Sequence, residues 1–285
     1  MRFLPVCFLW VGLMSAQAED EGYLLAKKEW HIPVGVKVEG KFARNLRKGK
    51  MKVISDGGWT SGTVTSQDRA GVVVERTAED SYRLTYGKLV SKYLMFFDGE
   101  KSHQVDESPL HEKVVQADFQ GGEWKAKVIE GDLDEVNPDL LAGRLRVIEE
   151  SIATSYGEQF YGLAPRKVGE RWKLDKPVLP GMEGIEVLEG EAEVTFQKVG
   201  EFQGLQCAYI QVKFDVTTNY TEGVSSTMKI TGEGVIIRAL DLQLDLHFKS
   251  GGRMISNSEM EGDTSVKTEG KYDLLQETHI VTKPE

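Results

Sequence analysis

The stretch CAYIQVKFDV, residues 207–216, alternates between apolar and polar side chains at every position. One face would carry Ala208, Ile210, Val212, Phe214 and Val216, and the other would carry Cys207, Tyr209, Gln211, Lys213 and Asp215. A period of two residues is the signature of a β-strand that buries one face and exposes the other. Antiparallel sheets allow this arrangement and all-parallel sheets seldom do.

The same alternation recurs on both sides of this stretch. Ala192, Val194 and Phe196 alternate with glutamate, threonine and glutamine. In LDLQLDLHF (residues 240–248), every second residue from Leu240 to Phe248 is apolar, so these residues are predicted to share one face. Short turn signals such as Asp98-Gly99 and Gly251-Gly252 separate the runs. The expected strands are 34–43, 50–55, 59–66, 70–78, 81–86, 89–97, 112–118, 123–130, 186–198, 205–217, 226–237, 239–248, 253–261, 265–273 and 276–282.

One segment between these runs predicts a helix, over residues 138–156. Asn137 suits the N-cap, Pro138 the first helical position, and Gly157 a left-handed C-terminal cap. One apolar stripe runs along this helix at spacings of three and four: Leu141, Leu145, Ile148, Ile152 and Tyr156. The stripe must be covered, so we expect it to pack on the apolar face of the sheet. It is also the candidate ligand-binding surface if the helix acts as a lid over a cavity, although core packing is the simpler role.

The predicted fold is therefore mainly β: an antiparallel meander that forms a curved sheet, a half-barrel or a sandwich, with one amphipathic helix packed on it. We expect a single β-rich domain over 19–285, in two halves (29–130 and 165–283) joined by the helix.

The first residues are typical of a secretory signal. Arg2 precedes an apolar run that is too short to span a bilayer, and Ala16-Gln17-Ala18 supplies small residues before Glu19. Cleavage between Ala18 and Glu19 would leave no stable membrane span, so we expect a secreted or periplasmic protein.

Charge and cysteine content narrow the classes of partner. The net charge is −10, and the loss of residues 1–18 removes Arg2 as the one charged residue. An acidic chain is not expected to bind nucleic acid, which demands a positive surface.

After cleavage Cys207 is the remaining cysteine, so no internal disulfide is expected. The alternation places Cys207 beside Lys213 and Asp215, which predicts a partly accessible thiol.

The sequence predicts no catalytic residue, no metal site and no cofactor. Ser226 and Lys229 match a Ser-x-x-Lys motif, but in a strand these positions face opposite sides. His103 and His111 are too far apart for a compact zinc motif. The leading hypothesis is a non-catalytic binding or carrier module for an apolar or amphipathic ligand. The alternatives are a structural or interaction protein of the cell envelope, with an envelope protein as its partner, and a secreted hydrolase whose site the sequence does not reveal.

Two stretches carry a resemblance to a known group of proteins. GLAPRKVGERWKL (residues 162–174) and GEAEVTFQKVGEFQGLQCAYIQV (residues 190–212), followed by TGEGVIIRA (residues 231–239), resemble an uncharacterised family of exported bacterial β-rich proteins over about residues 160–260. The shared positions are Pro165, Val168, Gly169, Trp172, Gly204, Ala208 and Ile210. They are structural, and the resemblance implies no activity. The order of elements is also similar, more loosely, to periplasmic lipoprotein-carrier half-barrels, in which helices line the concave face of a curved sheet.

Overall fold

The structure is a computed structural model of the 285-residue chain. It describes residues 22–27, 32–55, 58–97, 99–153, 156–177, 179, 186–220, 225–260 and 264–282. The predicted signal segment and its cleavage site at Ala18 and Glu19 lie outside the described residues.

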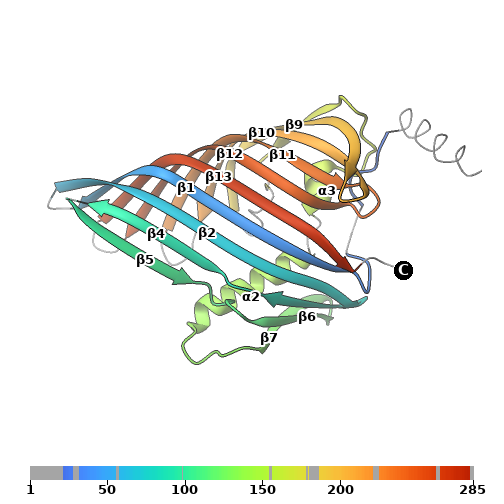
Figure 1. Ribbon diagram of the computed structural model, residues 1–285, viewed down its shortest axis with the longest axis horizontal. Coiled ribbons are helices and arrows are strands. Elements are labelled where there is room, and N and C mark those ends of the chain that lie inside the picture. Colours follow the sequence, from blue (N-terminus) through green and yellow to red (C-terminus); the bar gives the residue numbers. More distant parts are fainter. Residues whose placement is uncertain are drawn as a thin grey trace, which may run out of the picture.

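One large antiparallel sheet of 13 strands dominates the described chain, and it is not closed into a barrel. Figure 1 shows it as an arch that curves over the two helices. The strands run in the order β7-β6-β3-β2-β1-β13-β12-β11-β10-β9-β8, so the first and last strands of the main set, β1 and β13, meet in the middle. Their bounds are β1 Lys37–Ser55, β2 Gly58–Ala78, β3 Ser81–Tyr86, β4 Val90–Phe97, β5 Glu100–Glu107, β6 Val114–Gln120, β7 Glu123–Glu130, β8 Arg171–Asp175, β9 Glu186–Phe202, β10 Leu205–Tyr220, β11 Ser225–Ala239, β12 Leu244–Met260 and β13 Thr264–Thr282. The predicted fold class, a curved antiparallel meander with little helix, is confirmed.

Strand β10 shows why the alternating sequence forms this sheet. Ala208, Ile210, Val212, Phe214 and Val216 are all buried in the largest apolar cluster, while Lys213 and Asp215 on the other face are exposed. Burial of these five side chains removes apolar area from water, which is the main favourable contribution to folding. The faces predicted for residues 208–216 are confirmed.

Several strands are longer than expected. Residues 44–49 and 67–69, which were predicted to be breaks, lie inside β1 and β2. Gly251-Gly252, predicted as a turn, lies inside β12, where a Cβ on Gly252 would collide with the Thr231 carbonyl oxygen of β11. This glycine therefore permits close approach of two strands and does not reverse the chain.

Strand β12 also departs from the face pattern predicted for residues 240–248. Residues 240–243 form a turn, and the pairing with β11 shifts between Ile237 and Arg238, which leaves Leu246 as an extra residue in a β-bulge. Beyond the bulge the faces are exchanged. Asp245 and Phe248 both face the main core, whereas Leu244 and Leu246 lie in a smaller apolar cluster. The prediction that Leu244, Leu246 and Phe248 share a face was wrong.

The sheet branches at β2. The second half of β2 pairs with β3, from Val72 to Ala78, and the first half pairs with β4, from Gly62 to Arg69. The hairpin of β4 and β5 thus extends beside β3 and β6, and all residues of β5 are exposed.

The predicted helix is present but shorter at its C-terminal end. Helix α2 spans Pro138–Ala153, and α3 spans Tyr156–Tyr161. Asn137 caps α2 as predicted, because its side-chain oxygen accepts hydrogen bonds from the backbone N–H groups of Asp139 and Leu140 at 2.9 and 3.2 Å. Gly157 does not cap a helix; it lies inside α3, and Gly162, with φ of 74°, follows the end of that helix. No helix of the described ranges is long and apolar enough to span a bilayer.

Candidate functional site

The concave face of the sheet is built from alternate residues of the long central strands. In β1 these are Phe42, Arg44 and Leu46, which lie opposite Gln276, Leu274 and Tyr272 of β13. Leu274 and Tyr272 belong to the main apolar cluster, and Phe42 packs against it. Residues directly opposite in neighbouring strands share a face, so the same face continues into β2 through Asp68 and Ala70.

Helix α2 covers one arm of this face. Ile148 is 7% exposed and lies in a cluster with Leu84, Val115 and Ala117 of β3 and β6. Leu141, Leu145 and Ile152 are partly buried against the same cluster. The Glu149 side chain accepts a hydrogen bond from the backbone N–H of Ala126 at 2.8 Å, which ties the helix to β7. The helix therefore packs on apolar sheet surface, as expected from its stripe.

The opposite arm is covered by α3 and by the segment 23–26. Phe160, Tyr161 and Leu25 are buried against β9 to β12, and the Trp172 indole N–H donates to the Phe160 carbonyl at 3.0 Å. Arg238 reaches from β11 to hold this cover in place. Its Nε donates to the Leu25 carbonyl at 2.6 Å, and its guanidinium lies 4.3 Å from the centroid of the Tyr161 ring.

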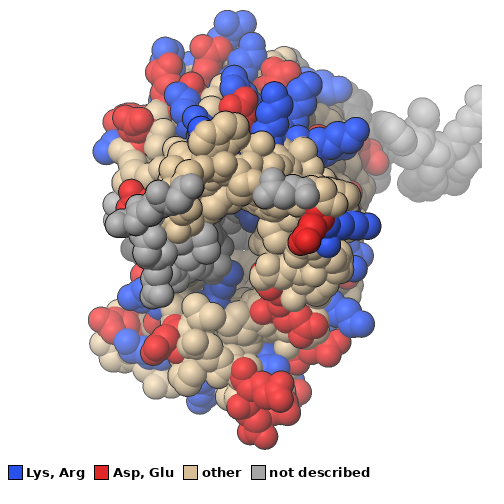
Figure 2. Space-filling view, turned by 90° about the vertical axis from the view of Figure 1, so that its left-hand side faces the viewer, with Lys and Arg blue, Asp and Glu red and all other residues tan. Residues whose placement is uncertain are grey.

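Between these two covers, the middle of the concave face carries several half-buried apolar side chains. These are Phe42, Ala70, Tyr93, Met95, Phe97 and Met254. Figure 2 looks at the end where β1 turns into β2, and it shows the molecule hollowed between its two arms. We call this part of the concave face the trough. A concave surface with partly exposed apolar side chains is the kind of surface that binds apolar ligands.

A polar band crosses the trough. Arg44 Nε donates to Asp68 Oδ2 at 2.7 Å, and Asp68 lies opposite Ser91 of β4. Tyr93 is near both charges. Its pKa is raised, first by burial and then by the negative charge of Asp68, so its hydroxyl stays protonated at neutral pH. The trough is thus amphipathic, with apolar surface on each side of a charged pair.

The trough residues were not among the predicted site residues. Arg44 and Asp68 fall in the two segments that were predicted to be breaks between strands. Of the predicted stripe, Leu141, Leu145, Ile148 and Ile152 lie together in the cluster beneath α2, and Tyr156 begins α3. The side chain of Tyr156 lies outside the described part of the structure. A role for these five residues in ligand binding stays a prediction.

The predicted accessibility of Cys207 is wrong. Its side chain is fully buried, in a small cluster with Ile237, Ala239 and Leu246 on the face of the sheet opposite the main core. Two groups of partly buried side chains pack around this cluster. The β9–β10 hairpin contributes Phe202 and Leu205, the turn before β12 contributes Leu242, and the first residue of β12 contributes Leu244. Burial also raises the pKa of the thiol. Cys207 does lie on the face opposite the main core, as the alternation predicts, but at this end of β10 both faces of the sheet are covered.

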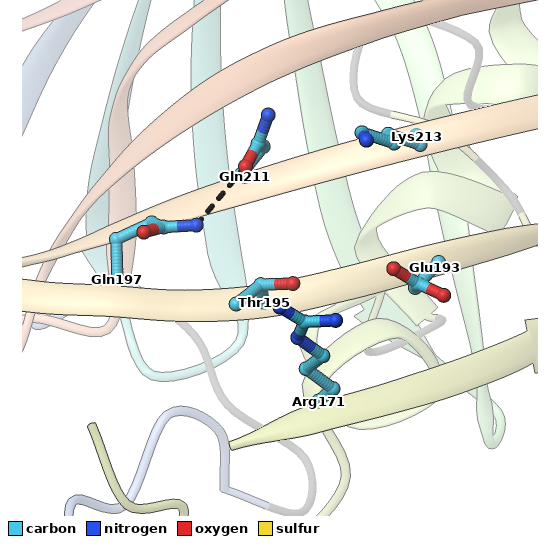
Figure 3. Close-up of a pocket in the computed structure, with 6 residues that line it drawn as sticks. All are labelled: Arg171, Glu193, Thr195, Gln197, Gln211 and Lys213. Carbon is cyan, nitrogen blue, oxygen red and sulfur yellow. Dashed lines mark hydrogen bonds between the residues drawn. The ribbon is translucent and has the colours of Figure 1, made fainter. Parts of the chain in front are cut away.

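A second surface depression lies on the outer face of β8, β9 and β10. Figure 3 shows its six polar residues: Arg171, Glu193, Thr195, Gln197, Gln211 and Lys213. Its volume is only about 80 Å³, and Gln197 donates to Gln211 at 3.0 Å across it. These side chains belong to the water-exposed face of alternating strands, so the depression is a polar surface feature and not an apolar site.

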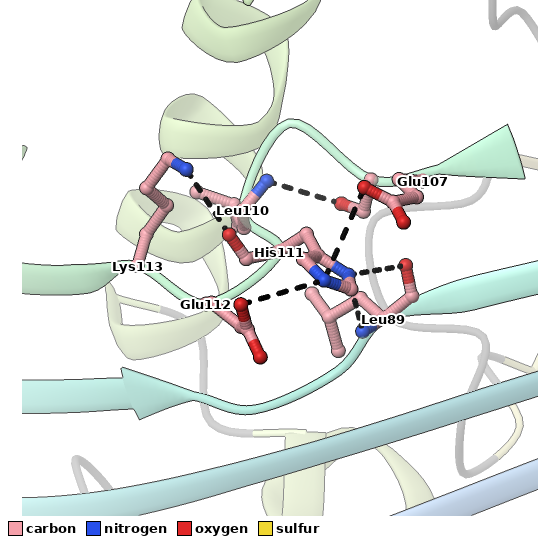
Figure 4. Close-up of polar contacts among 7 residues, drawn as sticks. Leu89, Glu107, Leu110, His111, Glu112 and Lys113 are labelled. Atoms are coloured by element: carbon pink, nitrogen blue, oxygen red, sulfur yellow. Dashed lines mark hydrogen bonds and ion pairs between the residues drawn. The ribbon is translucent and has the colours of Figure 1, made fainter. Parts of the chain in front are cut away.

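Histidine His111 has a structural role in the turn between β5 and β6. Figure 4 shows its ring against Leu89, where Nδ1 lies 3.2 Å from the backbone nitrogen, while Nε2 lies 3.9 and 3.8 Å from Glu107 and Glu112. His103 sits on β5, away from this turn, and is exposed. Within the described ranges no three histidine, cysteine, aspartate or glutamate side chains gather as metal ligands would.

The residues of the Ser-x-x-Lys motif, Ser226 and Lys229, lie in one strand, three residues apart. Lys229 pairs with Asp215 on the outer face at 3.1 Å.

Comparison with known proteins gives no sequence match. No family model matches the chain, and no curated protein matches it. Solved structures that are similar in fold include lipovitellin, described for its lipid–protein interactions, with a TM-score of 0.41, 11% identity and coverage of 90% of this chain. This chain spans only 26% of the lipovitellin chain.

Two bacterial structures are also similar, at lower scores. A putative outer membrane lipoprotein-sorting protein domain from Vibrio parahaemolyticus has a TM-score of 0.14 and 9% identity, with 85% of this chain and 87% of that chain covered. A β-barrel-like protein of a domain of unknown function from Brucella abortus has a TM-score of 0.17 and 10% identity, with coverage of 88% and 100%. They are of the two kinds that the sequence resembles, an uncharacterised β-rich family and lipoprotein carriers. Likeness at such TM-scores says nothing of function.

Proposed function

We propose that this protein is an exported, non-catalytic binding or carrier module whose trough holds an apolar or amphipathic ligand. The observation that carries the proposal is the half-buried apolar surface in the middle of the concave face, between α2 and α3. In a protein whose other concave surface is covered by helices, apolar side chains left partly in water are costly unless a ligand covers them.

The arrangement of the covers supports the same function. Among the described residues, packed elements close both arms of the concave face, and the apolar clusters of the sheet extend to the trough. Phe42 and Met254 of the trough pack against these clusters but stay partly exposed, which leaves apolar surface that a ligand would cover. The signal-like N-terminus of the sequence supports export to a compartment where apolar compounds must be carried through water.

The interaction alternative would depend on β5, whose eight residues are all exposed at an edge of the sheet. An open edge can pair with a strand of another protein. However, β5 carries Glu100, Lys101, Asp106 and Glu107, and charges of this kind protect edges from pairing. We therefore prefer the binding module.

The neutral dye N-phenyl-1-naphthylamine, which fluoresces in apolar surroundings, tests the proposal. We expect saturable binding to the purified protein. Ala70 lies opposite Phe42 in the trough, so Ala70→Trp should fill part of it and weaken binding about tenfold, which corresponds to about 1.4 kcal/mol. Thr65→Trp places the same side chain on the exposed outer face of β2 and serves as the matched control.

The result that would overturn the proposal is a parent protein with no saturable dye binding, or equal effects of the two tryptophan variants. Circular dichroism of both variants shows whether each keeps the β-sheet spectrum. A thermal melt then separates loss of binding from loss of folding.

A further inference from the structure

The outer face of the sheet carries exposed apolar side chains at the end where β1 turns into β2, on the left in Figure 1. Trp59 of β2 is 66% exposed, and Ile54, directly opposite it in β1, is 43% exposed. Phe96 of β4 is 44% exposed and shares this face, because it lies opposite Thr63, four residues after Trp59 in β2. Apolar side chains that gather in water in one place indicate a surface that contacts another molecule.

Lysines surround these apolar side chains. The Lys52 ammonium lies 4.7 Å from the centroid of the Trp59 ring, and the Lys101 ammonium lies 5.9 Å from the centroid of the Phe96 ring. Lys267 of β13 is directly opposite Lys52, although like charges in opposite positions destabilise a sheet. No ion pair joins these three lysines to any residue that the structure describes. We call Ile54, Trp59, Phe96, Lys52, Lys101 and Lys267 the basic aromatic patch.

The net charge of the chain does not decide what this patch attracts. The whole chain carries −10, but at physiological ionic strength the field of an exposed charge is largely screened beyond about 8 Å. On the same face, Glu269 of β13 is paired with Arg253. Glu259 lies on β12, two strands away from Ile54. The described side chains around Trp59 are therefore mainly basic.

This combination of side chains matches the interfacial region of a lipid bilayer. Tryptophan is enriched there, because its ring is apolar and its N–H reaches the polar head groups. Lysine lays its stem along apolar surface and keeps its ammonium among the head groups. On a membrane with anionic lipid, each lysine near the surface strengthens binding about fivefold.

The patch lies next to the trough, on the other face of the same strands. Along β1, Met51 is followed directly by Lys52 of the patch. Met51 is buried in the cluster against which Met95 and Phe97 of the trough pack. A bilayer that covered the patch at the strand ends would therefore lie close to the apolar side chains of the trough.

We propose that the basic aromatic patch docks this end of the sheet on an anionic lipid bilayer. Trp59 and Ile54 enter the head-group region, and the three lysines contact anionic head groups. The exposed apolar area selects a bilayer over a small anion, and charge complementarity selects anionic over neutral lipid. The inference goes beyond the proposed function, because it concerns the outer face and no residue of the patch lines the trough.

Vesicle flotation measures docking with the full chain. Vesicles of phosphatidylcholine alone are compared with vesicles in which one third of the lipid is phosphatidylglycerol. We expect about tenfold tighter binding to the anionic vesicles, and loss of this preference at high salt. The measurement includes the charges of Asp56 and Asp98, which fall in the turns after β1 and β4, outside the described residues.

The variant Lys52→Gln/Lys267→Gln should remove most of the preference for anionic vesicles, a loss of about tenfold. The matched control is Lys213→Gln/Lys249→Gln, because both lysines are exposed on the outer face, in β10 and β12, away from the patch. The control should stay within about twofold of the parent. All variants carry the same N-terminal segment, so a difference between them reports the patch.

A fluorescent label reports insertion of the patch itself. In a Cys7→Ser background, Ser61→Cys places a nitrobenzoxadiazole label on the exposed face of β2, two residues from Trp59, while Cys207 is buried in the native protein. Anionic vesicles should increase the emission of this label and shift it to shorter wavelength. Trp59→Ser should raise the lipid concentration needed for this response about tenfold. The same label at Lys249→Cys should not respond.

Equal binding of the parent to neutral and anionic vesicles would overturn the inference. Equal effects of the two double-lysine variants, or a label at Ser61→Cys that stays in water, would also overturn it. Binding of N-phenyl-1-naphthylamine to the trough is measured without vesicles, so the proposed function would stand after any of these results. Absence of saturable dye binding is a different result, and it would overturn the proposed function instead.

Discussion

Arg238 Nη1 donates a hydrogen bond to Asp245 Oδ1 at 2.6 Å; the Arg238 side chain is buried, with 5% exposed, and the Asp245 side chain is largely buried, with 13% exposed. The pair lies where α3 and the segment 23–26 meet the sheet. Arg238 Nε also bonds the Leu25 carbonyl, and the Tyr161 hydroxyl donates to Asp245 at 2.9 Å. Two strands, a helix and the N-terminal segment are therefore joined by one buried ion pair.

Replacement of this arginine should destabilise the protein strongly. Arg238→Met leaves the Asp245 carboxylate without its cationic partner, with only the Tyr161 hydroxyl still donating to it, and this should cost about 3–5 kcal/mol of unfolding free energy. The double variant Arg238→Met/Asp245→Leu removes both charges and should cost less than the single variant. Urea unfolding followed by circular dichroism gives both values.

The exposed pair of Arg47 and Asp273 provides the control for that measurement. Arg47→Met removes the same type of charge from the outer face, and exposed pairs contribute about 0–1 kcal/mol. A loss for Arg238→Met no larger than that for Arg47→Met would contradict a structural role for the buried pair.

Cys207 should resist thiol reagents in the native protein. With Cys7→Ser, Cys207 is the single thiol, and we expect no labelling by Ellman's reagent until denaturant is added. Burial excludes the reagent, and the raised pKa of the thiol lowers the fraction of reactive thiolate. Rapid labelling without denaturant would show that the cluster around Ile237 and Leu246 opens readily. Complete labelling in denaturant is the control for reagent activity.

Gly251 and Gly252 of β12 should respond differently to the same substitution. A Cβ on Gly252 meets the Thr231 backbone, which cannot move without shifting β11, so Gly252→Ala should cost about 1–3 kcal/mol or more. For Gly251 the nearest atom is the Tyr272 carbonyl oxygen at 3.5 Å, an ordinary contact. Gly251→Ala should therefore be neutral or slightly stabilising, since alanine restricts the unfolded chain. Thermal melting of the two variants compares them, and equal melting temperatures would contradict the close strand approach.

The sequence predicted the fold class because alternation records burial on one face, as in β10. Prediction from the sequence failed where the burial of a residue depends on distant parts of the chain. Arg44 and Asp68 interrupt the apolar pattern of the concave face, so the segments around them appeared to be breaks, although they neutralise each other across β1 and β2. The bulge at Leu246 exchanges the faces of β12, and no local pattern marks it. The trough follows from the curvature of 13 strands, which the sequence of any one strand does not encode.

The last prediction concerns Ile148 of α2 and decides between a core role and a lid role for the helix. The side chain is 7% exposed and lies among Leu84, Val115 and Trp124, so Ile148→Ala should cost about 2–5 kcal/mol if the site is rigid. Ile148→Asp buries a charge in an apolar cluster and should prevent stable folding. Leu140→Ala is the control, because Leu140 is on the same helix and 45% exposed. The loss of unfolding free energy for this variant should stay within about 0.5 kcal/mol.

A mobile lid would give the opposite result: an unchanged melting temperature for Ile148→Ala together with weaker binding of N-phenyl-1-naphthylamine. For Ile148→Ala we expect a large drop in melting temperature. At temperatures where this variant is still folded, its affinity for the dye should stay within about twofold of the parent, because the helix packs on β3, β6 and β7 and not across the trough.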